Sequence, residues 1–130
     1  MTKETNESKE DYLERILMLQ EETNAPVRAI DVANSMGFSK ASVSIALKKL
    51  EEEDFVIVGN KQSLHLTETG REIASKIYER HKVIGSIFIS LGVDEDTAYK
   101  DACKIEHDLS EETYQALKKH YFEHKDAIKK

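Results

Sequence analysis

Cys103, Glu106 and His107 combine metal-binding side chains with a spacing that brings those side chains together. Residues three and four positions apart on a helix lie on the same face. These three residues offer a thiolate, a carboxylate and an imidazole, a donor set suited to a divalent transition metal. The spacing therefore indicates a metal site. The alternative is that Cys103 is a small buried hydrophobic residue and that His107 is an ordinary hydrogen-bonded side chain.

Further candidate ligands lie elsewhere in the chain. Asp11 and Glu14 are three residues apart near the N-terminus and share one helix face, which is offset from the apolar face of that helix. His81 lies within a long amphipathic segment. Taken alone, Asp11 and Glu14 are typical of surface acids. The other histidines are interpreted as structural or exposed: His65, His120 and His124.

The helices that must position these residues follow from the hydrophobic spacing. Apolar residues at helical intervals predict helices over about 8–22, 29–35 and 39–53. Pro26 cannot continue a helix, and Gly37 lies in the tight turn before the third one. Two short helices joined by such a turn are typical of a helix-turn-helix.

A β-hairpin and three more helices are predicted next. The β-branched run 55–58 and the alternating run 63–66 have strand periodicity, and the polar residues 59–62 lie between them. The fold class is therefore mainly α, with an N-terminal winged helix-turn-helix and a two-stranded wing. The later helices are expected over about 68–91, 94–108 and from 110 onward, with Thr67, Asp94 and Ser110 at their starts.

A winged helix-turn-helix predicts binding to double-stranded DNA. The second helix of such a motif enters the major groove, and its first residues reach the base edges. Between Val27 and Lys49 the local net charge is +3, although the whole chain carries −6. The alternative is that the lysines form only a solvated face. The expected DNA-binding residues are Arg28, Ser39, Lys40, Ala41, Ser42, Ser44, Lys48 and Lys49, with Lys61 and Gln62 at the wing tip.

Composition excludes several other classes of protein. The chain has 130 residues and one cysteine, so it is too short for a multidomain enzyme and has no internal disulfide framework. No segment approaches the ~20 apolar residues of a membrane helix, and no signal-peptide core is visible, so a cytoplasmic protein is expected. The sequence has no phosphate-binding loop or nucleophile elbow, so we expect no catalysis.

At this point the chain resembles the DtxR/MntR family of metal-dependent transcriptional repressors, over nearly its whole length. The motifs that carry the resemblance are Asp11-Tyr12-Leu13-Glu14, LHLTETG at 64–70, Arg80-His81, Leu91-Gly92-Val93-Asp94 and, above all, DACKIEHDLS at 101–110. The resemblance implies a winged-helix DNA-binding domain over 1–70 and a helical dimerisation and metal-binding domain over 71–130. It also implies a homodimer on operator DNA, no small organic substrate, and repression of metal uptake genes.

The resemblance also implies a ligand set and a choice of metal. Cys103 matches a position that is Glu in typical manganese regulators and Cys in the iron-responsive branch. Mn(II) or Fe(II) is therefore expected, with Co(II) or Zn(II) possible because a thiolate is softer than a carboxylate. Gly85 and Tyr99 replace ligands of the iron branch's ancillary site, which we expect to be absent. The implied ligands are Asp11, Glu14, His81, Cys103, Glu106 and His107.

The resemblance is to the short manganese branch, without the SH3-like C-terminal domain of longer members. We expect the metal to fix the two domains so that a dimer presents its recognition helices to successive major grooves. The dimer surface is expected on the last two helices and the end of the helix over 68–91. The apolar residues near that end include both core and interface positions, which the sequence does not tell apart: Ile84, Ile87, Phe88, Ile89 and Leu91. Two other functions stay open: a metal-independent winged-helix regulator with Cys103 as an ordinary or redox-sensing thiol, and an enzyme or metal buffer.

Overall fold

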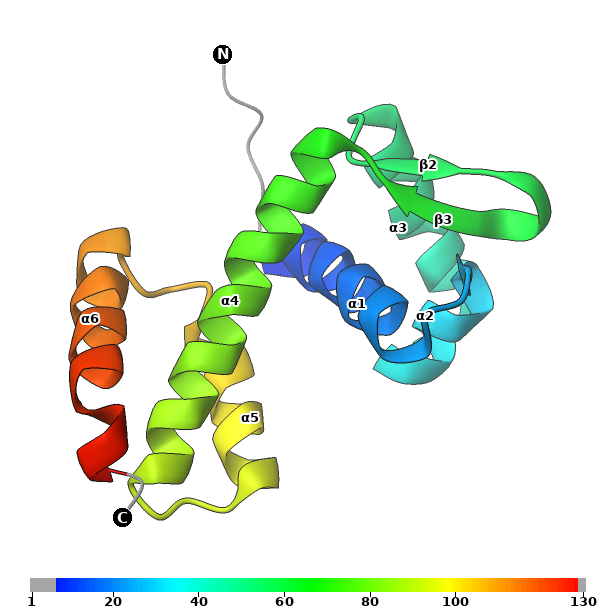
Figure 1. Ribbon diagram of the computed structural model, residues 1–130. Coiled ribbons are helices and arrows are strands. Elements are labelled where there is room, and N and C mark those ends of the chain that lie inside the picture. Colours follow the sequence, from blue (N-terminus) through cyan, green and yellow to red (C-terminus); the bar gives the residue numbers. More distant parts are fainter. Residues whose placement is uncertain (1–6, 129–130) are drawn as a thin grey trace. The chain divides into compact units, whose positions relative to one another are not determined.

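A computed structural model describes residues 7–128 of the chain, which is mainly helical (Figure 1). The chain divides into two compact units, with the division between Lys76 and Ile77. Within the described residues, no helix is both long enough and apolar enough to cross a membrane.

The first unit contains the predicted helix-turn-helix. Helix α1 (Glu7–Thr23) is followed by α2 (Ala29–Met36) and α3 (Lys40–Glu52). Gly37 ends α2 with a φ of 73°, a left-handed conformation that glycine adopts without a steric penalty. Ser39 then caps α3, because its side-chain oxygen accepts a hydrogen bond from the Ser42 N–H at 3.1 Å.

The hairpin is present, but its sheet has three strands. Strands β2 (Val56–Val58) and β3 (Ser63–Leu66) form the predicted wing (Figure 1). Strand β1 (Val27–Arg28) pairs with the other edge of β3. Val27 lies opposite Leu64 in the antiparallel register. The two-stranded prediction missed β1 because a two-residue strand is too short to show alternation.

A close backbone contact joins the residues just before β2 to the start of helix α4 (Glu68–Ser90). The Thr67 hydroxyl donates to the Asp54 carbonyl at 2.6 Å and accepts from the Gly70 N–H at 3.0 Å, which makes Thr67 the predicted cap of α4. A Cβ at Gly70 would overlap the Phe55 carbonyl oxygen, so only glycine fits here.

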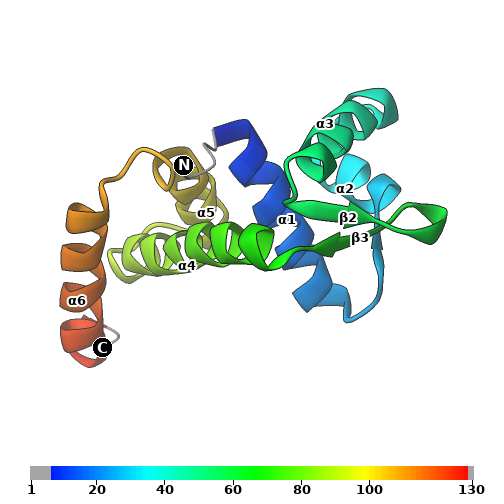
Figure 2. The same cartoon turned by 90° about the horizontal axis from the view of Figure 1, so that it is seen from above.

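The second unit consists of the C-terminal part of α4 with α5 (Glu95–Ile105) and α6 (Glu111–Ile128). Both views show α5 and α6 beside this part of α4 (Figure 2). Asp94 caps α5 by accepting from the Thr97 N–H, and Ser110 caps α6 by accepting from the Thr113 N–H, each at 3.1 Å. Both residues were predicted to start these helices.

One expectation for this unit needs correction. Helix α5 ends at Ile105, not near Asp108, because the Glu106 carbonyl accepts a hydrogen bond from a side chain of α4 and does not continue the helical ladder. The sequence left open which apolar residues near the end of α4 are core. Ile84 is only 1% exposed and is one of them, whereas Ile89 and Leu91 are 39% and 72% exposed.

Candidate metal centre and DNA-reading surface

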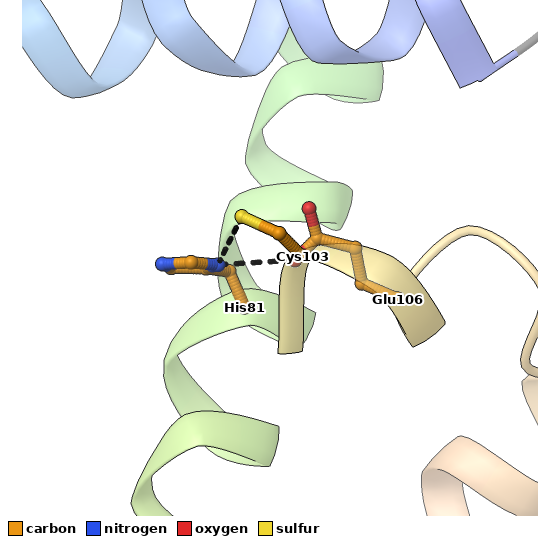
Figure 3. Close-up of side chains that lie close together, drawn as sticks. All are labelled: His81, Cys103 and Glu106. Atoms are coloured by element: carbon orange, nitrogen blue, oxygen red, sulfur yellow. Dashed lines mark hydrogen bonds and ion pairs between the residues drawn. The ribbon is translucent and has the colours of Figure 1, made fainter. Parts of the chain in front are cut away.

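His81 on α4 meets Cys103 and Glu106 of the α5 segment, as Figure 3 shows. The Cys103 Sγ lies 3.6 Å from His81 Nδ1, and Glu106 Oε2 lies 3.2 Å from the same nitrogen. The thiol, the carboxylate and the imidazole all lie within 4.8 Å of one another. Packing of α4 against α5 thus joins His81 to residues more than twenty positions later in the chain.

Glu106 is the centre of this cluster, because each of its carboxylate oxygens faces an imidazole. Oε2 faces His81, and Oε1 lies 3.5 Å from His107 Nε2. The Glu106 side chain is fully buried, and burial of a carboxylate is costly unless cations or donors surround it. Four of the six predicted ligands therefore gather within the second unit: His81, Cys103, Glu106 and His107.

Arg80, the residue before His81, holds the end of α5 in place. Its guanidinium donates to the carbonyl oxygens of Glu106 at 2.9 Å and Leu109 at 2.6 Å. It also donates to Glu111 at 3.2 Å and lies 4.9 Å from the centroid of the Tyr114 ring. A buried guanidinium with these partners fixes the backbone that carries Glu106.

Tyr99 forms a wall of the cluster. Its ring stacks on the His81 imidazole, with the two centroids 5.0 Å apart. The Tyr99 ring also fills the space over Gly85, where a Cβ would overlap it. Gly85 and Tyr99, which the sequence marked only as replacements for ancillary ligands, thus pack against each other and orient a predicted metal ligand.

Sequence reasoning missed the roles of Arg80 and Tyr99, although a signal for Tyr99 was present. Tyr99 and Cys103 are four apart on α5, and His81 and Gly85 are four apart on α4, so each pair shares a helix face. A glycine on a ligand-bearing face leaves room for a large side chain from a neighbouring helix. The contacts of Arg80 had no comparable sequence signal.

Asp11 and Glu14 lie on α1 of the first unit, three residues apart as predicted. Glu14 is only 4% exposed and Asp11 is half-buried, which departs from the surface-acid alternative. Their assignment as ligands stays a prediction.

The predicted DNA-binding residues are all exposed. Lys40 and Ser44 on α3 line a hollow together with Gln62 of the wing tip, so the recognition helix and the wing present one surface. Ser39 is less available to DNA than expected, because its hydroxyl also donates to the Ser42 Oγ at 2.9 Å. The other exposed residues of this set are Arg28, Ala41, Ser42, Lys48, Lys49 and Lys61.

A winged helix-turn-helix followed by a helical unit with a mixed-donor cluster defines a class of metal-dependent transcriptional regulators. Residues 4–64 match the iron dependent repressor N-terminal DNA binding domain, and residues 67–125 match the iron dependent repressor metal binding and dimerisation domain. The chain therefore belongs to the DtxR/MntR family of metal-dependent transcriptional repressors. Members of this family are not enzymes.

Curated relatives agree with this assignment. The chain is 37% identical to an uncharacterised HTH-type transcriptional regulator of Methanocaldococcus jannaschii, over 95% of this chain and 99% of that protein. It is 34% identical to the HTH-type transcriptional regulator MntR of Bacillus subtilis, over 97% of this chain and 89% of MntR.

Solved structures give the same fold. The structure of the manganese regulator SloR matches with a TM-score of 0.74 and 30% identity, over 86% of this chain and 52% of SloR. A manganese-dependent transcriptional repressor in complex with manganese matches with a TM-score of 0.75 and 26% identity, over 84% of this chain and 50% of that one. The chain thus spans about half the length of these solved proteins.

Proposed function

We propose that this chain represses metal uptake genes in the cytoplasm, as a homodimer that binds operator DNA when a divalent transition metal is bound at the second-unit cluster. The observation that carries this proposal is the buried Glu106 carboxylate between His81 and His107, with Cys103 beside it. A thiolate, a carboxylate and two imidazoles fit an ion such as Fe(II), Mn(II), Co(II) or Zn(II). Fe(II) and Mn(II) are the expected physiological ions.

The two proposed domains have different roles. Residues 1–70 read DNA, and residues 71–130 hold the metal and the dimer partner. We propose that Asp11 and Glu14 complete the ligand set from α1, so that metal binding couples the domains. This step rests on the resemblance of the Asp11-Tyr12-Leu13-Glu14 segment to the manganese branch and on the carboxylate chemistry.

Electrostatics supplies the physical reason for the coupling. Asp11, Glu14 and Glu106 would repel one another if they shared a site without a cation. A divalent ion offsets that charge when it is bound. Because DNA binding requires two recognition helices at the ~34 Å spacing of successive major grooves, fixing the domains favours the DNA-bound dimer. Metal and DNA then strengthen each other's binding by a reciprocal ~1–3 kcal/mol.

The test begins with a duplex library of random sequence, from which the protein selects binding sites in Mn(II) or Fe(II). Affinity for a selected duplex is then measured with each metal and with a chelator. We expect binding to be at least about fivefold tighter with metal, the lower end of typical coupling. Equal affinity in metal and chelator would favour a metal-independent regulator. Metal binding without sequence-specific DNA binding would favour a metal buffer.

Variants separate the two parts of the proposal. E14Q should weaken metal binding, whereas E21Q, at an exposed position on the same helix, should not. K40A should lower affinity for all duplexes and reduce the slope of log affinity against log salt by about 1, because one phosphate contact is lost. K104A, at an exposed lysine of α5, is the matched control.

A further inference from the structure

A second group of metal-binding side chains lies on α6, outside the cluster of the proposed repressor function. His120 and His124 are both exposed, and their imidazole rings stack with centroids 4.3 Å apart. Residues four apart on a helix lie one above the other on the same face, so the stacking follows from the helix itself. The pair therefore needs no other element to bring it together.

A backbone contact favours one tautomer of the neutral His124 ring. His124 Nδ1 lies 2.9 Å from the His120 carbonyl oxygen. A carbonyl oxygen can only accept a hydrogen bond, so Nδ1 carries the proton. In the neutral ring this leaves the lone pair on Nε2. A histidine that donates its other ring N–H to a backbone carbonyl is the usual arrangement of a metal-ligating histidine, because that bond fixes both tautomer and ring direction.

The sequence around this pair repeats the spacing of the first cluster. His120, Glu123 and His124 are at positions i, i+3 and i+4, as are Cys103, Glu106 and His107. Glu123 is exposed on the same helix and adds to its negative charge. An exposed helix with this pattern offers nitrogen ligands to a cation without the cost of burying its charge.

We infer that His120 and His124 form a separate surface site for a late first-row divalent ion, of which Zn(II) is the representative. Imidazole suits zinc, nickel and copper, whereas Mn(II) forms the weakest complexes of the series with a given donor set. Two protein ligands leave the remaining coordination positions to water or to a donor from another molecule. The site is therefore open and exchangeable, and it discriminates against Mn(II).

The experiment counts the Zn(II) and Mn(II) ions bound by the full chain, by equilibrium dialysis with metal analysis. The double variant H120Q/H124Q should bind one Zn(II) fewer per chain than the wild type, with unchanged Mn(II) binding. Glutamine has a good helix propensity, so α6 should be retained, and circular dichroism checks this. Equal Zn(II) stoichiometry in the two proteins would overturn the inference, whatever the outcome for the first cluster.

Two further variants test the geometry. H65Q removes an exposed histidine of the first unit and should bind as many Zn(II) ions as the wild type. K119H/H120Q keeps two histidines on α6 but separates them by five residues, so they no longer share a face. The K119H/H120Q variant should bind Zn(II) at this site at least tenfold more weakly than the wild type. An affinity equal to that of the wild type would contradict chelation of the ion by His120 and His124. Long-range ¹H–¹⁵N spectra should show Zn(II) shifting the Nε2 signal of His124.

Discussion

Tyr99 stacks its ring on the His81 imidazole, with 5.0 Å between centroids and 25° between the ring planes. His81 is thereby held between an aromatic ring and the Glu106 carboxylate. Y99A should leave the imidazole free to rotate and should lower affinity for Co(II) by about 10–100-fold, the usual effect of losing a residue that orients a ligand. Titration of the Co(II) absorption bands measures this. Y99F keeps the stacked ring and should bind like the wild type.

Gly85 leaves the space that the Tyr99 ring occupies. A Cβ at this position would overlap the Tyr99 ring, so G85A should lower the free energy of unfolding by about 1–3 kcal/mol, the usual cost of overpacking. Urea denaturation measures the change. In G85A/Y99A the clash is removed, and the double variant should be no less stable than Y99A alone. Equal costs of G85A in both backgrounds would show that Tyr99 is not the residue that excludes a side chain.

Cys103 should determine the choice of metal. C103E replaces a soft thiolate with a hard carboxylate, and the hard ligand suits Mn(II) better. The ratio of Mn(II) to Co(II) affinity, measured by competition, should rise in C103E. C103S removes the thiolate without adding a carboxylate and should weaken Co(II) binding without improving Mn(II) binding. An unchanged ratio in C103E would show that Cys103 does not set selectivity.

Arg80 should be essential for the stability of the second unit. R80A leaves the carbonyl oxygens of Glu106 and Leu109 without their guanidinium donor, which should cost about 2–4 kcal/mol in the free energy of unfolding. E111Q removes only a half-exposed ion-pair partner and should cost less than about 1 kcal/mol. Thermal and urea denaturation distinguish the two. Similar costs for both variants would contradict the role given to the carbonyl contacts.

Tyr114 should make stability fall at alkaline pH. Burial, followed by the charge of Glu79, raises the pKa of Tyr114 to about 12 from its ordinary 10.0. The neutral phenol is favoured in the folded state, so this stabilisation is fully present below pH 10 and is lost as the pH rises through 12. Urea denaturation at intervals between pH 9 and 12 should show a smaller decline for Y114F. A parallel decline in both proteins would show that Tyr114 makes no pH-dependent contribution.

The helices and their starts were determined largely by the sequence. Helix periodicity and capping involve residues only a few positions apart, so Ser39, Thr67, Asp94 and Ser110 could each be recognised without knowledge of the fold. The shared face of Cys103 and Glu106 follows from the same local geometry. Assigning both residues to a family ligand set required the resemblance in addition.

Only the tertiary structure decided how the second unit completes that cluster. Glu106 reaches His81 across 25 positions of the chain, and Arg80 reaches Leu109 across 29. Such contacts depend on how α4 packs against its neighbours, which spacing along one helix cannot specify. The same packing diverts the Glu106 carbonyl to Arg80, and α5 therefore ends at Ile105, earlier than its sequence pattern predicts.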